Sequence, residues 1–194
     1  MADITGDELR SSAREQMQNA FDHFKELVDR VPADVWGNAT PCQDWDVRAL
    51  LNHMTAEHLW APRLLAGESI EQVGGEYDGD VLGDDPIAAW DTAQMKSRES
   101  WAAANDDTPV ELSSGRASAE EYAEQMLLDL TVHAWDLARG AGIEEGPVVA
   151  DTVMHVLHYV RESGLVGHAP FGPEVSTDSD NPQDQLVALL GRRP

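Results

Sequence analysis

The sequence predicts an all-α protein, an antiparallel four-helix bundle with a short C-terminal extension. Apolar residues recur every three or four positions over several long segments, which is typical of helices that bury one face. Capping residues, glycines and prolines stand at the ends of these segments, where they favour helix starts and stops. With 194 residues, the chain is long enough for one domain with its own core. We expect the bundle over residues 1–165 and a tail that packs on it over residues 166–194.

The first two helices of the bundle have clear ends. The apolar repeat predicts the first helix over residues 7–30, and Pro32 follows its end. The second is expected over residues 47–66, because Asp46 is suited to cap its start and Gly67 to close it. A long acidic loop that contains several glycines follows the second helix.

Three further helices and a helical piece in the tail are expected after this loop. Asp85 with Pro86 is a typical helix start, and Ser118 with Glu121 has the spacing of a capping box. Asn181 can cap the helical piece in the tail in the same way. The predicted elements are a third helix over 86–105, an extended segment TPVELSSG, a fourth helix over 119–140, a fifth over 147–163 and the tail helix over 182–190.

The chain is strongly acidic, with 36 Asp and Glu against 13 Lys and Arg and a formal net charge of −23. Such a surface repels phosphate backbones and anionic lipids, so we expect neither a nucleic-acid nor a membrane partner. The N-terminal segment lacks the apolar run of a signal peptide, and Cys42, the one cysteine, cannot form an internal disulfide. These features predict a soluble, cytoplasmic protein, with monomer and homodimer both left open.

Two of the predicted helices carry a histidine with a carboxylate one turn away. His53 and Glu57 are four residues apart in the second helix, as are Asp129 and His133 in the fourth, with Asp136 on the flank. Residues at this spacing share a helix face, and the apolar pattern turns both faces toward one interior. Two imidazoles and a carboxylate suit zinc, iron, nickel or manganese. A histidine hydrogen-bonded in the core is the alternative, and the spacing alone leaves both interpretations open.

Other polar residues receive a structural interpretation. His155 and His158 lie three apart on the fifth helix, where we expect no acidic partner one turn away. The acidic loop begins like a calcium-binding loop but has Leu82 and Ala89 at ligand positions, so we expect a solvated loop. The sequence contains no HExxH motif, no phosphate-binding Walker loop and no GxSxG elbow.

Cys42 and the tryptophans are candidates for the walls of a pocket. Cys42, near a helix start, is either a reactive thiol or a small buried residue, and the second interpretation is favoured. The six tryptophans are expected in the core, although Trp45 and Trp60 flank the helix of His53 and could wall a pocket.

Three separate segments together resemble a known family. The segments are VPADVWGNATPCQDWDVRALLNHM, LDLTVHAWDLARG and FGPEVS…DQLVALLGRRP. In this order they are similar to the metal-binding proteins related to mycothiol-dependent maleylpyruvate isomerase, within the DinB-like four-helix superfamily. The resemblance covers nearly the whole chain. It implies a DinB-like bundle with one divalent metal, usually zinc, held by His53, Asp129 and His133. Asp129 stands where the isomerase branch carries a glutamate.

The resemblance also implies a chemistry. The isomerase uses the small thiol mycothiol as cosubstrate, so we expect a thiol-dependent transferase or isomerase that acts on a small electrophile. Glu57 is expected to accept a proton or to orient an imidazole, with a helix-surface role as the alternative. The isomerase has a further C-terminal domain at its active site, and the short tail here offers Arg192 and Arg193 instead. Two other functions stay open, a non-enzymatic metal-binding or scaffold protein and a metal-dependent hydrolase that uses metal-bound water.

Overall fold

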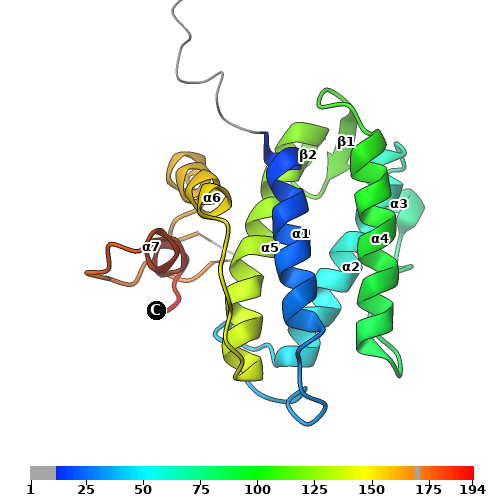
Figure 1. The fold of residues 1–194 in the computed structure, drawn as a ribbon. Helices are drawn as coiled ribbons and strands as arrows, with labels where there is room; N and C mark the ends of the chain where they lie inside the picture. The colour runs from blue at the N-terminus through cyan, green and yellow to red at the C-terminus, as the bar shows by residue number, and fades with distance from the viewer. Residues whose placement is uncertain (1–11, 169–170) are drawn as a thin grey trace, which may run out of the picture.

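A computed structural model describes residues 12–168 and 171–194. Within these residues, the chain forms the mostly helical DinB-like bundle that the sequence predicts (Figure 1). The helices are α1 (Ala13–Val28), α2 (Val47–Leu65), α3 (Ile70–Val73), α4 (Pro86–Ala103), α5 (Ala119–Ala141), α6 (Ala150–Ser163) and α7 (Pro182–Leu189). Strands β1 (Pro109–Leu112) and β2 (Gly115–Ser118) form a small antiparallel hairpin before α5.

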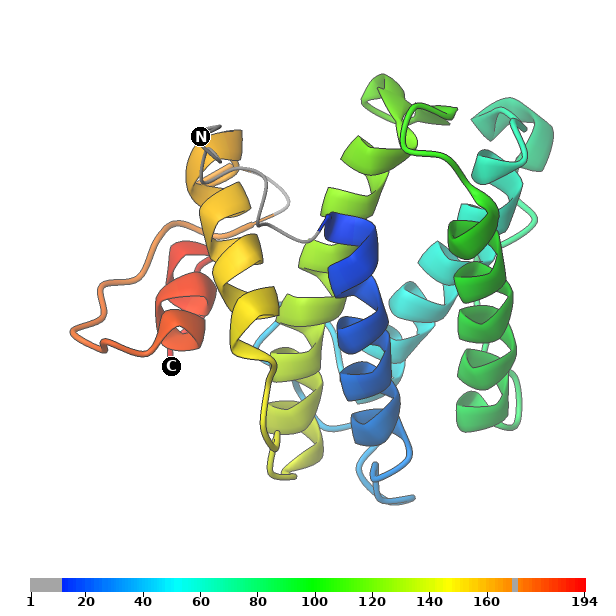
Figure 2. The same ribbon diagram turned by 45° about the horizontal axis from the view of Figure 1, so that its top comes forward.

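The four long helices of the bundle form two pairs, in which α1 packs mainly against α5 and α2 mainly against α4. The starts of α1 and α5 lie together, because the backbone N–H of Ala13 donates to the Glu120 carboxylate at 3.4 Å. By contrast, an ion pair of 2.9 Å between Lys25 and Asp91 joins the end of α1 to the start of α4. The helices of each pair therefore run in the same direction, and the two pairs are antiparallel to one another (Figures 1 and 2).

The predicted capping residues begin the helices of the structure. The side chains of Asp46, Asp85, Ser118 and Asn181 each accept a hydrogen bond from a backbone N–H in the first turn of the helix that follows. Ser12 does the same for α1, and the part of the first predicted helix before it lies outside the described residues. These ends follow from the sequence because a cap acts within a few residues.

The structure adds two short elements that the sequence did not reveal. Helix α3 lies within the predicted acidic loop, where Ser69 and Gln72 form a capping box. Strand β2 pairs with β1, so that the predicted extended segment is one half of a hairpin. Both elements are too short to show an apolar repeat. Helix α6 begins at Ala150 rather than near Pro147. Helix α5 ends at Ala141, and Gly142 follows it in the left-handed conformation.

The C-terminal segment covers one side of the bundle. Helix α6 packs on α1, α5 and α7, so that α6 and α7 lie beside α5 on the side away from α4 (Figure 2). Because α6 contacts the bundle helices α1 and α5 as well as α7 of the tail, the structure does not test the predicted boundary at residue 165. Among the described residues, no helix has the length and apolar character needed to cross a membrane.

A glycine near the end of α5 lets the loop before α2 approach closely. A Cβ atom at Gly140 would lie 2.7 Å from Cγ2 of Thr40 and 3.0 Å from Cγ2 of Val47. The first distance is shorter than side-chain contacts allow and the second is tight, so a larger residue would push this loop away. The loop carries Cys42 and Trp45, and Gly140 thereby helps to place both beside α5.

Candidate metal centre

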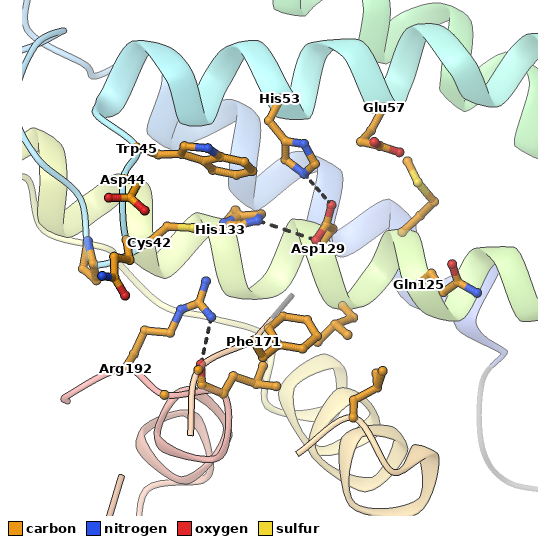
Figure 3. A pocket seen from close by; sticks show the side chains of 18 of the residues that line it. Cys42, Asp44, Trp45, His53, Glu57, Gln125, Asp129, His133, Phe171 and Arg192 are labelled. Carbon is orange, nitrogen blue, oxygen red and sulfur yellow. Dashed lines mark hydrogen bonds and ion pairs between the residues drawn. The ribbon is translucent and has the colours of Figure 1, made fainter. Parts of the chain in front are cut away.

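A cavity of about 910 Å³ lies between the bundle and the C-terminal segment (Figure 3). Helices α2 and α5 form one wall, and residues 41–45 of the loop before α2 form a second. The third wall comes from Tyr159 of α6, Phe171 and Arg192. The turn of the hairpin also reaches the cavity. The C-terminal segment is therefore part of the site and not only a cover for the core.

His53, Asp129 and His133 lie together on the wall of this cavity. Nε2 of His53 is 3.0 Å from Oδ2 of Asp129, and Nε2 of His133 is 3.6 Å from Oδ1 of the same carboxylate. One ligand atom from each of the three residues lies within 4.8 Å of the other two. The structure thus brings together the three residues that the family resemblance implies as ligands.

The geometry of these three residues fits a divalent metal ion. Ligand atoms about 2.0–2.2 Å from a zinc ion lie roughly 3.3–3.6 Å apart in a tetrahedral arrangement. The separations of 3.0 Å and 3.6 Å, which involve the two different oxygens of Asp129, lie close to this range, and ligand atoms of all three residues lie within 4.8 Å of one another. The side chains of His53 and Asp129 are 27% and 26% exposed, so a molecule in the cavity can reach the same point.

A buried carboxylate orients His133. Oδ2 of Asp136 lies 3.0 Å from Nδ1 of His133, and the Asp136 side chain is 0% exposed. Burial by itself would raise the pKa of Asp136, but the hydrogen bonds from His133 and Arg192 outweigh burial and lower it. An ionised carboxylate only accepts hydrogen bonds, so Nδ1 of His133 carries the proton. In the neutral ring, Nε2 on the side of Asp129 then has the lone pair that a metal requires.

Mutual attraction favours the charged forms of His53 and Asp129 in the absence of a metal. Burial lowers the pKa of His53, but the hydrogen bond and the negative charge of Asp129 outweigh burial and raise it overall. Burial likewise opposes the charge of Asp129, whose pKa is nevertheless lowered by the hydrogen bond from His53 and by the nearby imidazoles. A metal ion would take the place of the proton between these two side chains.

Glu57 lies farther along the cavity, one turn of α2 beyond His53 (Figure 3). Burial and the negative charge of Asp129 raise the pKa of Glu57. A carboxylate with a raised pKa is a stronger base than an exposed glutamate. Glu57 therefore lines the cavity, and its role in accepting a proton or orienting an imidazole stays a prediction.

Cys42 lies on the other side of His133 and belongs to a second group with ligand-type atoms. Its sulfur, a nitrogen of His133 and an oxygen of Asp136 lie within 4.8 Å of one another. Asp136, however, is already bound by His133 and Arg192. Burial and the charge of Asp136 raise the pKa of the Cys42 thiol to about 11. The thiol is protonated at neutral pH, which favours the interpretation of Cys42 as a packing residue.

Trp45 forms the wall behind the two imidazoles. Its ring centroid lies 4.6 Å from that of His53 and 5.6 Å from that of His133. The preceding residue, Asp44, has a φ of 70°, the one positive φ of a non-glycine residue among the described residues. Such a backbone costs free energy and is often found at functional sites. Trp60 packs against Tyr77 instead and does not line the cavity.

The histidines of α6 do not belong to the site, but the expectation that no acidic partner lies one turn away was wrong for His158. Nε2 of His155 lies 2.9 Å from the carboxylate of Glu124 on α5. Nε2 of His158 lies 2.9 Å from that of Glu162, one turn along the same helix. Glu124 comes from another helix, whereas Glu162 lies four residues after His158 in the sequence. Neither histidine lines the cavity, which agrees with a structural role.

The tail, α5 and α6 contribute residues to the cavity that the sequence could not assign to a site. Arg192 lines the cavity and is 7% exposed, whereas Arg193 is exposed and does not line it. Phe171 and Tyr159 also line it, as does Tyr122, whose hydroxyl is buried without a hydrogen-bond partner. No local pattern marks these aromatic residues, because they meet only when α6 and the tail fold against α5.

The structure is a helical bundle in which two helices that carry histidines face one cavity. This places the protein in the class of DinB-like helical proteins with a candidate metal centre. Residues 17–138 match the family model of the mycothiol maleylpyruvate isomerase N-terminal domain, so the chain belongs to that family, as the sequence predicted. It is similar to uncharacterized proteins of Mycobacterium tuberculosis strains CDC 1551 / Oshkosh and ATCC 25618 / H37Rv. Each is 28% identical over 187 residues, which cover 90% of this chain and 94% of the relative. No solved structure matches the chain significantly.

Proposed function

We propose that the protein binds one divalent metal ion and uses it to activate a small thiol for transfer to, or isomerisation of, a small electrophile. Zinc is the expected metal, with nickel, iron and manganese as alternatives, and mycothiol is the expected thiol. The convergence of His53, Asp129 and His133 on one cavity carries the proposal. Membership of a family named for a mycothiol-dependent isomerase supports the choice of thiol.

The three ligand-type residues would hold the ion, with the imidazoles neutral and Asp129 ionised. The ion supplies Lewis acidity, which favours the thiolate form of a thiol at neutral pH. Glu57 is the group that would accept the thiol proton, because burial and the nearby charge of Asp129 raise its pKa. The electron pair left on sulfur then forms a bond to the electrophilic carbon of the second substrate, while the π bond at that carbon breaks and its electrons move to the far end of the π system. Glu57 can later return its proton to the product.

The cavity walls support this chemistry. Trp45 covers one side of the two imidazoles, and Phe171 from the tail faces the same cavity. Apolar walls limit the access of water and strengthen electrostatic interactions within the cavity. Such walls would protect a reactive thiolate while both small molecules are held close to each other.

Thiol-dependent turnover tests the proposal. Zinc-loaded protein is mixed with mycothiol and a small electrophile such as an acrylamide, and loss of free thiol is followed over time. We expect catalysed loss that requires metal, protein and thiol together and that His53→Ala abolishes. Hydrolysis of ester substrates without thiol would favour the hydrolase instead. Tight metal binding with neither reaction would favour a non-enzymatic metal-binding protein.

A further inference from the structure

The end of the chain reaches the candidate metal centre through a continuous series of hydrogen bonds. Arg192, just after α7, binds Asp136 on α5, and Asp136 binds Nδ1 of His133. We infer that Arg192 is a positioning residue for the metal centre, because it fixes Asp136 and thereby the orientation and tautomer of His133. The inference rests on the proposed metal binding. It gives the C-terminal segment a defined role in a site whose candidate ligands all lie on α2 and α5.

The contact between Arg192 and Asp136 has the geometry of a strong and directional ion pair. Nη2 of Arg192 donates to Oδ2 of Asp136 at 2.8 Å, and Nε donates to Oδ1 at 3.3 Å. Both side chains are buried, Arg192 with 7% of its surface exposed and Asp136 with none. Two parallel hydrogen bonds fix the plane of a carboxylate as a single bond cannot. Loss of one partner would leave the other charge buried and unpaired.

The guanidinium group is itself held in place by the tail. Nη1 of Arg192 donates to the backbone carbonyl of Leu190 at 3.0 Å, and the group lies 5.9 Å from the ring centroid of Phe171. Leu190 follows directly after α7, and its side chain is buried in the core. The position of the guanidinium therefore depends on the docking of α7. This links the fold of the tail to the orientation of Asp136.

The hydrogen bond to Asp136 decides which of the two ring nitrogens of His133 carries the proton. With Asp136 fixed, Nδ1 donates to the carboxylate, and the lone pair of Nε2 faces the side of Asp129. Without Arg192, Asp136 loses two of its hydrogen bonds and is free to rotate away from Nδ1. The ring of His133 is then free to turn and to place its proton on Nε2, which cannot bind a metal in that form. Partners of this kind usually change metal affinity about 10- to 100-fold.

The neighbouring arginine provides a matched control. Arg193 has the same side chain one residue further on, but it is exposed and does not line the cavity. Zinc affinity would be measured by competition with a chromogenic chelator for the wild type, Arg192→Gln, Arg192→Lys and Arg193→Gln. We expect Arg192→Gln to bind zinc about 10- to 100-fold more weakly and Arg193→Gln to match the wild type. Arg192→Lys should fall between them, because lysine keeps the charge but not the two parallel bonds.

A second measurement separates positioning from a general effect on folding. The tautomer of His133 would be read from the ¹⁵N chemical shifts of its ring in the metal-free protein. We expect a protonated Nδ1 in the wild type and in Arg193→Gln, and a mixture of tautomers in Arg192→Gln. Should Arg192→Gln fail to fold, Arg192→Lys and Asp136→Asn provide the same two measurements in variants of similar shape.

Two outcomes would overturn the inference. One is a folded Arg192→Gln protein that binds zinc as tightly as the wild type. The other is weaker binding with an unchanged His133 tautomer, which would indicate a structural role only. If the wild type binds no zinc, the proposed function fails, but the ring shifts of the metal-free protein still show whether Arg192 orients His133.

Discussion

Nε2 of His53 on α2 lies 3.0 Å from Oδ2 of Asp129 on α5, and the two residues are 76 positions apart in the sequence. The contact joins the two antiparallel helices that carry the candidate ligands. It also places His53 beside His133, whose ring centroid is 5.4 Å away. Two helices fixed by their packing thus present three ligand-type side chains at one point, and several measurable consequences follow.

Metal content should follow these three residues. Protein purified without chelator is expected to carry about one divalent ion per chain, because three protein ligands make one site. His53→Ala and His133→Ala should each lose most of it in elemental analysis. His155→Ala is the matched control, because His155 is also paired with a carboxylate but lies outside the cavity. Full metal content in both ligand variants would contradict the assignment.

Replacements of Asp129 should show whether this residue is a metal ligand or only a hydrogen-bond partner of the histidines. Asp129→Asn keeps the size but removes the charge, so metal binding should weaken sharply while the bundle still folds. Asp129→Glu keeps a carboxylate and should retain the metal. If Asp129 were only a partner of the histidines, Asp129→Asn would keep the metal and lose about 1–3 kcal/mol of stability. Elemental analysis and thermal unfolding of the two variants distinguish these cases.

Metal affinity should decrease as pH falls. His53 binds a metal only without its proton, and Asp129, acting against burial, raises the pKa of His53 above the usual value of 6.5. Protons should therefore compete with the metal from a pH above that value downward. The apparent dissociation constant is expected to rise by up to about tenfold per pH unit for each proton displaced. Chelator competition at several pH values between about 8 and 5 measures this, and a constant affinity would argue against imidazole ligands.

The stability of the metal-free protein should depend on pH through His58. This side chain is buried, its Nδ1 lies 2.9 Å from the hydroxyl of Ser97, and burial lowers its pKa from 6.5 to about 3. Between these values the unfolded chain binds a proton that the folded protein excludes. The contribution of His58 is therefore complete above about pH 6.5 and is lost as pH falls toward about 3.

Urea unfolding at pH values between these limits can isolate this contribution. His58→Gln should reduce the loss of stability on acidification by up to about 1.4 kcal/mol per pH unit, although it also lowers stability at neutral pH. His158→Gln is a suitable control, because its side chain is 43% exposed. An identical pH dependence in His58→Gln and the wild type would show that His58 is not buried in the neutral form.

The charge of the cavity should select among electrophiles. Arg192 is the one Lys or Arg among the described residues that line it, and Asp136 already pairs with this cation. Asp44, Glu57 and Asp129 line the same cavity. In the zinc-loaded protein, Asp129 and the bound thiolate offset the charge of the ion, so that the negative charge of Asp44 remains. Uncharged acrylamides should therefore react faster with the thiol than matched acrylamides that carry a carboxylate, because the carboxylate is repelled.

Asp44→Asn tests this charge effect directly. Asparagine keeps the shape and tolerates the φ of 70° at this position. The preference for uncharged electrophiles should fall by roughly fivefold or less, since one charge acts with about 1 kcal/mol in a partly hydrated cavity. Asp34→Asn removes an exposed charge outside the cavity and should change nothing. A faster reaction with the carboxylate in the wild type would contradict the expectation.

Local signals in the sequence predicted the helices and their starts. The capping residues Asp46, Asp85, Ser118 and Asn181 act on backbone groups within their own first turn, so their effect does not depend on the rest of the fold. The spacing of Asp129 and His133 is equally local, because residues four apart on a helix share a face. The apolar pattern also turned the helix face of His53 toward the same interior, and the family resemblance then singled out His53, Asp129 and His133 as the ligands.

The way in which these elements meet depends on contacts between distant parts of the chain. The parallel course of α1 with α5 and of α2 with α4, and the approach of His53 to Asp129, depend on packing between distant segments. The same holds for Arg192, which is 56 positions from Asp136 and binds it only when α7 docks. The conformation of Asp44 also follows from its surroundings, since a positive φ is unfavourable for that residue alone. Local interactions fix helices, whereas a site built from several helices takes its geometry from their mutual packing.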